Sequence, residues 1–445
     1  MEKQTNKKKK TVILLYIITI ILLILWSIRL DLINMDNIFT LRMIQHPFSE
    51  IIKLDSMDVH PPLYYIILKI FFNITFISHA SPFVQVVAGR LLNVLFFMVT
   101  LIVMRSILNK TIHQQYSFLF LLLVSLFPTV IWQSTGIRMY SLSALFIACE
   151  LNSIINYNRN KRLKDIILAT VFASLGAWTH YFTAIIAGLL LFYNFVGEKH
   201  KRIPYLISGI AFFISFVPWL QISMNQVRSV EHSYWIKNQI AEYFNVFMYQ
   251  KLGELLNDKA SMCFTILFLI CLMYITFKTL KSFNAEFKKY YVMIAMVLLG
   301  TIVLGFVLSV IIRPIFQERY VYGVSLIYFI MTLPLIKKFV STKLTNGADR
   351  IIKGCLFLLI GIGTTLNLAL GVFYNLKEIK IYNTIRTIEC SDSKVVKGNN
   401  DETTLLGDSF FVQDKIFTTK NYNKINHSCQ SKELFESIYP NIKDN

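Results

Sequence analysis

Five short segments of the sequence concentrate side chains that can move protons or bind anions. They are DNIF (36–39), DVHPPLYY (58–65), GIRMYS (136–141), THYF (179–182) and RPIFQERY (313–320). A carboxylate beside an apolar surface can act as a general base toward a hydroxyl. The planar guanidinium of arginine binds phosphate through two parallel hydrogen bonds and stays charged. The residues that could do this chemistry are Asp36, Asp58, His60, Arg138, Tyr140, His180, Tyr181, Arg313, Arg319 and Tyr320.

The stretch DSMDVHPPLYY (55–65) holds an acidic residue and a histidine just before an apolar run. Pro61 and Pro62 fix two backbone dihedrals and remove two donors, so no helix runs through them. Proline is nevertheless favoured in the first turn of a helix. We therefore predict a helix that begins near Pro61, with Asp58 and His60 held at its start.

The elements that carry these segments are membrane helices. Of the 445 residues 55% are hydrophobic and only 16% are charged, against about 25% charged in a typical soluble domain. Apolar runs long enough to cross a bilayer recur along the first 375 positions, and we expect about eleven crossings. The predicted spans are 11–28, 86–105, 116–133, 139–157, 165–182, 184–197, 204–220, 261–279, 290–312, 321–336 and 351–374.

The basic residues set the predicted orientation. The net charge of +19 is spread over short clusters between apolar runs, including 158–164, 197–202, 277–289 and 337–353. Such clusters are typical of cytoplasmic loops and not of a nucleic-acid surface. The basic start, MEKQTNKKKK, precedes a long apolar run without an A-x-A-like site, which predicts an uncleaved first span with its N-terminus inside.

The segment after HPP, LYYIILKIFFNITFI, is short and is interrupted by Lys69 and Asn73. Counting it as a span would place the lysine clusters outside, so we expect it to lie along the outer interface or to dip into it. All five polar segments then fall on the outer side. Ionisable groups beside a bilayer are usually functional, so we predict one composite site there. The sequence has no P-loop and no dinucleotide-binding fingerprint, so a cytoplasmic nucleotide donor is unsupported. A base and phosphate-binding arginines at the outer leaflet fit a lipid-phosphate donor.

Several of these stretches together resemble a known family. The marks are an acidic residue soon after the first span, D-x-H-P-P-L-Y-Y, R-M-Y-S-L, T-H-Y-F and a late R-P-x-x-x-x-R-Y. Over roughly residues 10–335 the chain is similar to the GT-C glycosyltransferases, specifically bacterial relatives of the dolichyl-phosphate-mannose protein mannosyltransferases (family 39-like). The fold that the resemblance implies is an all-α polytopic bundle with a juxtamembrane helical first outer loop.

The resemblance implies inverting transfer of a sugar from a polyprenyl-phosphate donor to an outer acceptor hydroxyl on a cell-envelope glycan, lipid or protein. The family's first-loop motif is Asp-Glu, whereas this chain has Asp36-Asn37. Asp36 is thus the expected base, and Asp58 either shares that role or orients the acceptor. Some family members hold a divalent metal near the substrate phosphate. His60 and His180 could support one, but they lack a strong metal-ligand spacing, so the cofactor stays unknown.

Each of these residues also has a structural interpretation. Asp36 and Asp58 could be helix caps, His60 and His180 hydrogen-bonded wall residues, and Arg138 a headgroup contact. Arg319 could likewise be a headgroup contact. Arg313 precedes a proline and is better explained as an interfacial anchor. Tyrosines at these positions are also typical of the aromatic belt at a membrane interface.

The chain changes character near residue 376. We predict a transmembrane domain at 1–375 and an extracytoplasmic tail at 376–445 that is polar and contains a strand or two. Cys390 and Cys429 lie in this tail. They could form a disulfide, because an outer compartment permits one, or remain as two free thiols.

Two other functions compete with the glycosyltransferase. A transporter or flippase for a lipid-linked or anionic solute would place ionisable residues at the midplane and show internal repeats. A non-catalytic assembly protein would use the motifs only to cap its spans. The clustering of charged residues at outer ends, with no visible repeat, favours the enzyme.

Overall fold

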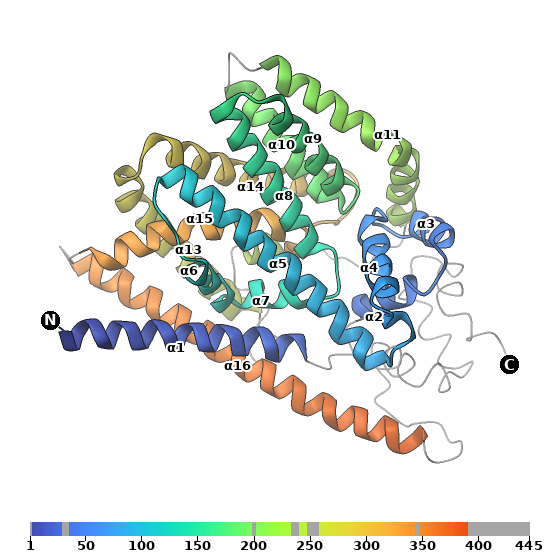
Figure 1. Cartoon of the computed structure of the whole chain (residues 1–445), viewed down its shortest axis with the longest axis horizontal. Coiled ribbons are helices and arrows are strands. Elements are labelled where there is room, and N and C mark those ends of the chain that lie inside the picture. The colour runs from blue at the N-terminus through green and yellow to red at the C-terminus, as the bar shows by residue number, and fades with distance from the viewer. Residues whose placement is uncertain are drawn as a thin grey trace.

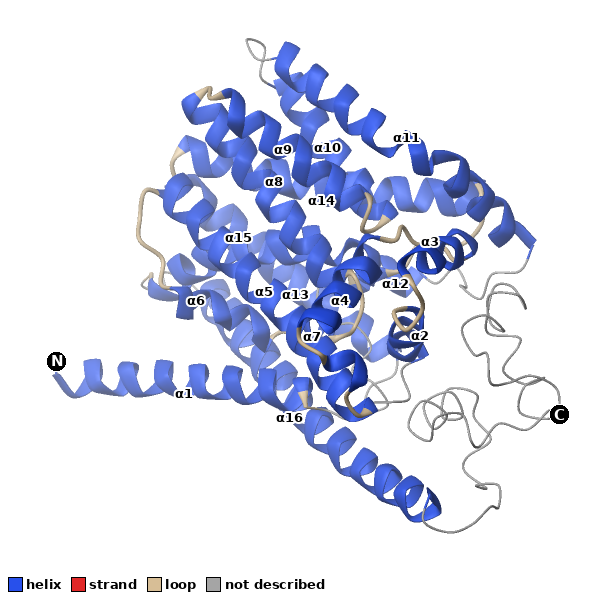
Figure 2. Cartoon of the chain, turned by 45° about the vertical axis from the view of Figure 1, so that its right-hand side comes forward, coloured by secondary structure: helices blue, strands red, loops and turns tan. Residues whose placement is uncertain are grey.

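The computed structural model describes residues 2–28, 35–197, 202–232, 240–246, 258–342 and 347–389. Within these ranges every regular element is a helix (Figure 2). The first half contains α1 (Glu2–Ser27), α2 (Met35–Met43), α3 (Phe48–Met57), α4 (Leu63–Ile74), η1 (Ile77–His79), α5 (Pro82–Ile112), α6 (Phe118–Leu122), η2 (Leu123–Leu126), α7 (Pro128–Thr135), α8 (Tyr140–Asn160), α9 (Leu163–Ala177) and α10 (Tyr181–Gly197). The second half contains α11 (Arg202–His232), α12 (Ile240–Asn245), α13 (Asp258–Thr279), η5 (Leu280–Ser282), α14 (Ala285–Ile311), η6 (Glu318–Val321), α15 (Tyr322–Ser341) and α16 (Gly347–Glu389).

Six helices in the described part are long and apolar enough to cross a membrane. They cover Phe83–Ile112, Arg202–Arg228, Met262–Ser282, Ala285–Ile311, Glu318–Ser341 and Gly347–Leu370. Large apolar side chains also face outward from them, such as Ile214 on α11 and Ile311 on α14. An apolar exterior of this kind is stable in lipid and not in water. The chain is therefore a multi-pass helical membrane protein, as the composition predicts.

The predicted apolar runs coincide with helices, with one exception. At 116–133 the structure has three short elements, α6, η2 and α7, in place of a single helix. Phe127 adopts an extended backbone with φ −84° and ψ 130°, and Pro128 follows at the start of α7. Because proline disfavours helical backbone in the residue before it, the apolar run breaks at this point.

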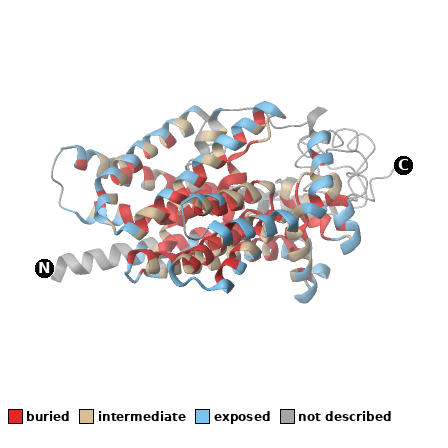
Figure 3. Cartoon of the chain, turned by 90° about the horizontal axis from the view of Figure 1, so that it is seen from above, coloured by how far each residue is buried: buried red, intermediate tan, exposed pale blue. Residues whose placement is uncertain are grey.

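The core lies around α8 and α15. Helix α8 contacts α5, α7, α9, α10 and α15, and buried residues concentrate in the middle of the bundle (Figure 3). Gly323 allows α15 to approach α8 closely, because a Cβ there would lie 2.6 Å from Ile147 Cδ1 and 3.1 Å from Ala144 Cα. This contact fixes the start of α15, which is one of the elements of the site described below.

Three short helices, α2, α3 and α4, connect α1 with α5 and lie together at one end of the molecule (Figure 1). Helix α4 begins at Leu63, directly after Pro61 and Pro62, and has 12 residues. It is therefore about 18 Å long, too short for a hydrocarbon core of about 30 Å. This agrees with the prediction that the HPPLYY segment does not cross.

The predicted boundary at residue 375/376 does not coincide with the end of a helix. Helix α16 contacts α1 along one edge of the bundle and continues through this position to Glu389 (Figure 1). Residues 376–389, predicted to belong to a polar tail, are thus the last part of α16. Positions 390–445, with Cys390, Cys429 and the predicted strands, lie outside the described residues.

Candidate functional site

The five polar segments meet at one end of the bundle. Asn37 Oδ1 on α2 accepts a hydrogen bond of 2.9 Å from the Ile137 backbone, which joins DNIF to GIRMYS. The Leu63 amide donates to the Trp178 carbonyl at 3.1 Å, which brings the HPPLYY and THYF segments together. Arg319 in η6 pairs with Asp36 on α2. Segments from five parts of the sequence therefore form one continuous site.

Asp36 and Arg319 form the ion pair at its centre. Arg319 Nη1 donates to Asp36 Oδ2, and the Arg319 guanidinium also lies 5.8 Å from the centre of the Tyr320 ring. Burial raises the pKa of Asp36, but the charges of Arg319 and Arg138 and the Arg319 hydrogen bond outweigh burial. The pKa of Asp36 therefore lies below its usual value, and the carboxylate is ionised at neutral pH.

Arg138 lies in the loop between α7 and α8 and is buried. Its Nη1 atom is 3.4 Å from both Thr40 Oγ1 on α2 and Tyr65 Oη on α4. Its Nε atom is buried without a hydrogen-bond partner among the described residues. A buried guanidinium with an unused donor is poised to bind an anion.

His60, Tyr140, His180 and Tyr320 form an aromatic cluster beside the arginines. The ring centres of His180 and Tyr320 are 4.9 Å apart, those of His60 and His180 5.2 Å, and those of Tyr140 and His180 5.9 Å. His180 Nδ1 accepts a hydrogen bond of 3.1 Å from the Phe182 amide. In the neutral ring the proton is then on Nε2, which is buried and unpartnered in the described structure. His180 can therefore donate to a bound oxygen.

Burial, followed by the charges of Arg138, His180 and Arg319, keeps the pKa of His60 well below its usual value. Its Nδ1 atom is also buried with no partner in the part of the chain that is described. His60 is thus a neutral imidazole that can exchange hydrogen bonds with a ligand without bringing a charge into the site.

Tyr181, although adjacent to His180, does not join this cluster. Its hydroxyl donates to Gln226 on α11 and accepts a hydrogen bond of 3.0 Å from Trp219 Nε1. Gln226 in turn donates from Nε2 to the Asp55 carbonyl at 2.8 Å. Tyr181 therefore links α10 to α11 and α3, and supports the wall of the site from behind.

Asp55 is a buried residue of the site that was not predicted from the sequence. It lies in the last turn of α3, and Asp58 follows as the C-cap residue of the same helix. Both carboxylate oxygens of Asp55 are buried without a hydrogen-bond partner among the described residues. Burial, and then the charge of Asp58, raises the pKa of Asp55 well above its usual value. The D-x-x-D spacing of residues 55–58 is the sequence signal that could have identified it.

The structure also decides one alternative for Asp58. The N-cap residue of α4 is Pro62, and no side chain caps this end, so Asp58 does not cap the helix that follows the prolines. Burial raises the pKa of Asp58 to about 6, although Arg138 opposes the shift. Its Oδ2 atom is buried and unpartnered in the described part, and it can accept a proton or a hydrogen bond from a ligand.

The site offers few side-chain donors for a metal ion. In the described residues no group of three or more His, Cys, Asp or Glu side chains is arranged to hold a metal ion. The adjacent imidazoles of His60 and His180 are two nitrogen donors, and the carboxylate of Asp36 is paired with Arg319. This donor set does not provide three protein ligands, and no step below passes through a metal.

No protein-family model and no curated protein matches the chain. A search of solved structures finds ArnT from Cupriavidus metallidurans, crystallised in the apo state, with a TM-score of 0.50 and 12% sequence identity. The match covers 96% of this chain and 78% of the ArnT chain. At this identity the likeness shows the fold alone. The described part of this multi-pass membrane protein is all-helical, and its fold is similar to that of ArnT.

Proposed function

We propose that the protein is an integral-membrane glycosyltransferase. It transfers a sugar from a polyprenyl-phosphate donor to a hydroxyl of an extracytoplasmic acceptor, with inversion at the anomeric carbon. The ArnT-like fold supports the class. The observation that carries the proposal is the ion pair of Asp36 with Arg319 beside the buried Arg138. It supports the proposal because a sugar transfer of this kind needs a carboxylate that can act as a base and guanidinium groups that can bind phosphate.

In the proposed reaction Asp36 removes the proton from the acceptor hydroxyl. The acceptor oxygen attacks the anomeric carbon, and the bond between that carbon and the phosphate oxygen breaks on the opposite side. Polyprenyl phosphate leaves with the bonding electrons, and a protonated Asp36 remains. Arg138 and Arg319 stabilise the negative charge that grows on the departing phosphate.

The orientation belongs to the same proposal. The site faces the extracytoplasmic side, the N-terminus is cytoplasmic, and the tail after α16 is extracytoplasmic. The support is the positive charge of the loops at the opposite end of the bundle, for example 158–164 and 277–289, since lysine and arginine accumulate in cytoplasmic loops. The acceptor is then a glycan, a lipid or a protein of the cell envelope.

The function is tested with purified protein in proteoliposomes that contain labelled polyprenyl-phosphate sugars and envelope extract. We expect label to move from the donor to an acceptor in the extract, with release of polyprenyl phosphate. A donor that remains intact and moves between the two leaflets would instead identify a flippase. No change in the donor across a panel of common hexoses and pentoses would overturn the proposal.

Asp58 predicts a pH dependence. We propose that it orients the acceptor hydroxyl in its ionised form, so activity should fall as the pH drops through about 6, where Asp58 takes up a proton. Asp36, with its lowered pKa, stays ionised over the same interval. In Asp58→Asn we expect kcat/KM to be about tenfold lower at neutral pH, with the decline near pH 6 absent. The measurement is kcat/KM from about pH 5 to about pH 8.

Glu50→Gln is the control for this variant, because Glu50 is an exposed carboxylate on the same helix, α3. It should keep the wild-type profile. A decline near pH 6 that is as steep in Asp58→Asn as in the wild type would remove Asp58 from the proposed mechanism.

A further inference from the structure

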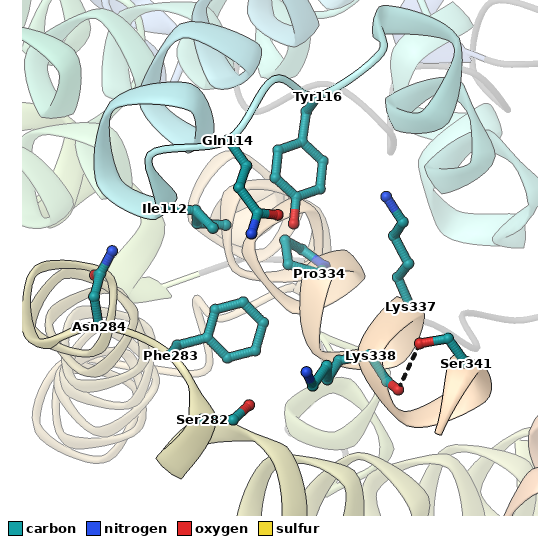
Figure 4. A pocket seen from close by; sticks show the side chains of 10 residues that line it. All are labelled: Ile112, Gln114, Tyr116, Ser282, Phe283, Asn284, Pro334, Lys337, Lys338 and Ser341. Carbon is teal, nitrogen blue, oxygen red and sulfur yellow. Dashed lines mark hydrogen bonds between the residues drawn. The ribbon is translucent and has the colours of Figure 1, made fainter. Parts of the chain in front are cut away.

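A cavity of about 370 Å³ lies between the loop after α5, the start of α14 and the last turns of α15. This volume is within the range of small-molecule sites. Figure 4 shows Lys337 extending toward Tyr116 and Lys338 lying on the side of Phe283 and Ser282. The other lining residues are Ile112, Gln114, Asn284, Pro334 and Ser341.

The cavity and the candidate active site are at opposite ends of the bundle. Helix α15 starts beside the active site at Tyr322 and ends beside the cavity at Ser341, after 20 residues. At 1.5 Å per residue this separates the two sites by about 30 Å. The cavity is thus independent of the proposed sugar transfer, and it faces the side that the basic loops indicate as cytoplasmic.

One wall of the cavity is held in place by partly buried hydrogen bonds. Arg105 Nε on α5 donates to the Tyr116 carbonyl at 2.6 Å, and the Tyr116 amide donates to Asn109 Oδ1 at 2.7 Å. The Tyr116 side chain is buried. On the opposite wall, Asn284 caps α14 by accepting a hydrogen bond of 2.8 Å from the Phe287 amide. The cavity is therefore formed by fixed elements.

Its charge is positive. Lys337 and Lys338 line it, and none of the lining residues is acidic. The Lys337 ammonium lies 5.2 Å from the ring centres of both Tyr116 and Phe120, so the aromatic wall holds this cation at the cavity edge. The nearby carboxylate of Glu286, in the first turn of α14, already contacts His113 at 3.5 Å and Arg159 at 3.6 Å.

We propose that this cavity binds a phosphate-bearing anion. The two ammonium groups bind the phosphate oxygens through charge-assisted hydrogen bonds, and the amides of Gln114 and Asn284 contribute further polar contacts. Ile112, Phe283 and Pro334 supply an apolar wall for the group that the phosphate carries. An anionic lipid headgroup and a soluble phosphate ester share this chemistry, and the experiment separates them.

Binding is measured by thermal-shift titration of the full-length protein with two probes. One is sodium pyrophosphate added to protein in detergent, and the other is phosphatidylglycerol, compared with phosphatidylcholine, in nanodiscs. A ligand that binds only the folded state stabilises it by RT ln(1 + [L]/Kd), so the melting temperature rises with ligand concentration. We expect one probe to stabilise the wild type, and its apparent Kd to rise at least about tenfold in the double variant Lys337→Gln, Lys338→Gln. The probe that responds identifies the source of the phosphate.

The matched control is Lys161→Gln with Lys164→Gln, which removes the same charge from the C-cap of α8 and the first turn of α9 and should keep wild-type binding. If the double variant does not fold, Lys338→Gln alone tests the proposal, because it leaves Lys337 on its aromatic wall. Stabilisation that is equal in wild type and lysine variant, or absent with both probes, would overturn the proposed site.

Discussion

Asp36→Asn should reduce the rate of sugar transfer by about 10²–10⁴-fold, the usual cost of losing a general base. Asparagine has the shape of aspartate but cannot take up the acceptor proton at neutral pH. In the wild type Arg319 donates a hydrogen bond to Asp36 Oδ2. The amide oxygen of asparagine can still accept this hydrogen bond, so the fold around the site should be retained. The measurement is the initial rate of transfer from a polyprenyl-phosphate sugar in membranes, normalised to the amount of inserted protein.

Two further measurements separate loss of the base from loss of the ion pair. The melting temperature of Asp36→Asn should stay near that of the wild type, since Asp36 is only half-buried. Asp36→Glu keeps the charge, and should recover part of the activity. If Asp36→Asn retained most of its activity, the base would be elsewhere, and Asp58 would be the first residue to test in its place.

Arg138→Lys should lower kcat by about 10²-fold, the cost of removing one donor that stabilises a growing negative charge. The variant keeps the positive charge, but a lysine ammonium is a point charge and cannot reproduce a planar fork. Arg138 reaches Thr40 and Tyr65 through Nη1, while Nε stays available for the phosphate. Lysine cannot make both sets of contacts. The measurement is kcat and KM for the lipid-phosphate donor.

Arg159→Lys is the matched control, because Arg159 lies at the end of α8 that is remote from Arg138 and pairs there with Glu286 at 3.6 Å. This variant should behave as wild type. Full activity in Arg138→Lys would mean that only the charge of Arg138 matters, and that Arg319 makes the directional contacts with the phosphate.

The class of fold could be predicted because the bilayer demands long apolar runs. Ten of the eleven predicted runs coincide with helices in the described residues. The exception, 116–133, shows what hydropathy does not detect: the run is apolar throughout, and one proline at position 128 divides it. The number of crossings stays a prediction. About eleven were predicted, whereas six helices in the described residues are long and apolar enough to cross a membrane.

The candidate site was predictable where a residue stands out against its surroundings. Arg138 and His180 lie in polar segments at the outer ends of predicted spans and in stretches that resemble the family motifs, so their positions pointed to a role. Asp55 did not stand out, because its sequence neighbours are polar, and its burial results from the packing of α3 against α11. Tyr181 was predicted to belong to the site as part of the THYF segment, but consecutive residues at the start of a helix point in different directions. Contacts between distant helices decided both cases.

The pairing of Asp36 with Arg319 has a consequence for the biosynthesis of the protein. The two residues are 283 positions apart in the chain, and the helices between them must be inserted before the contact can form. Helix α15, which begins three residues after Arg319, is among the last helices to leave the ribosome. A nascent chain that stops before residue 319 therefore has Asp36 but not yet Arg319. The proposed catalytic centre is therefore completed only late in the synthesis of the chain.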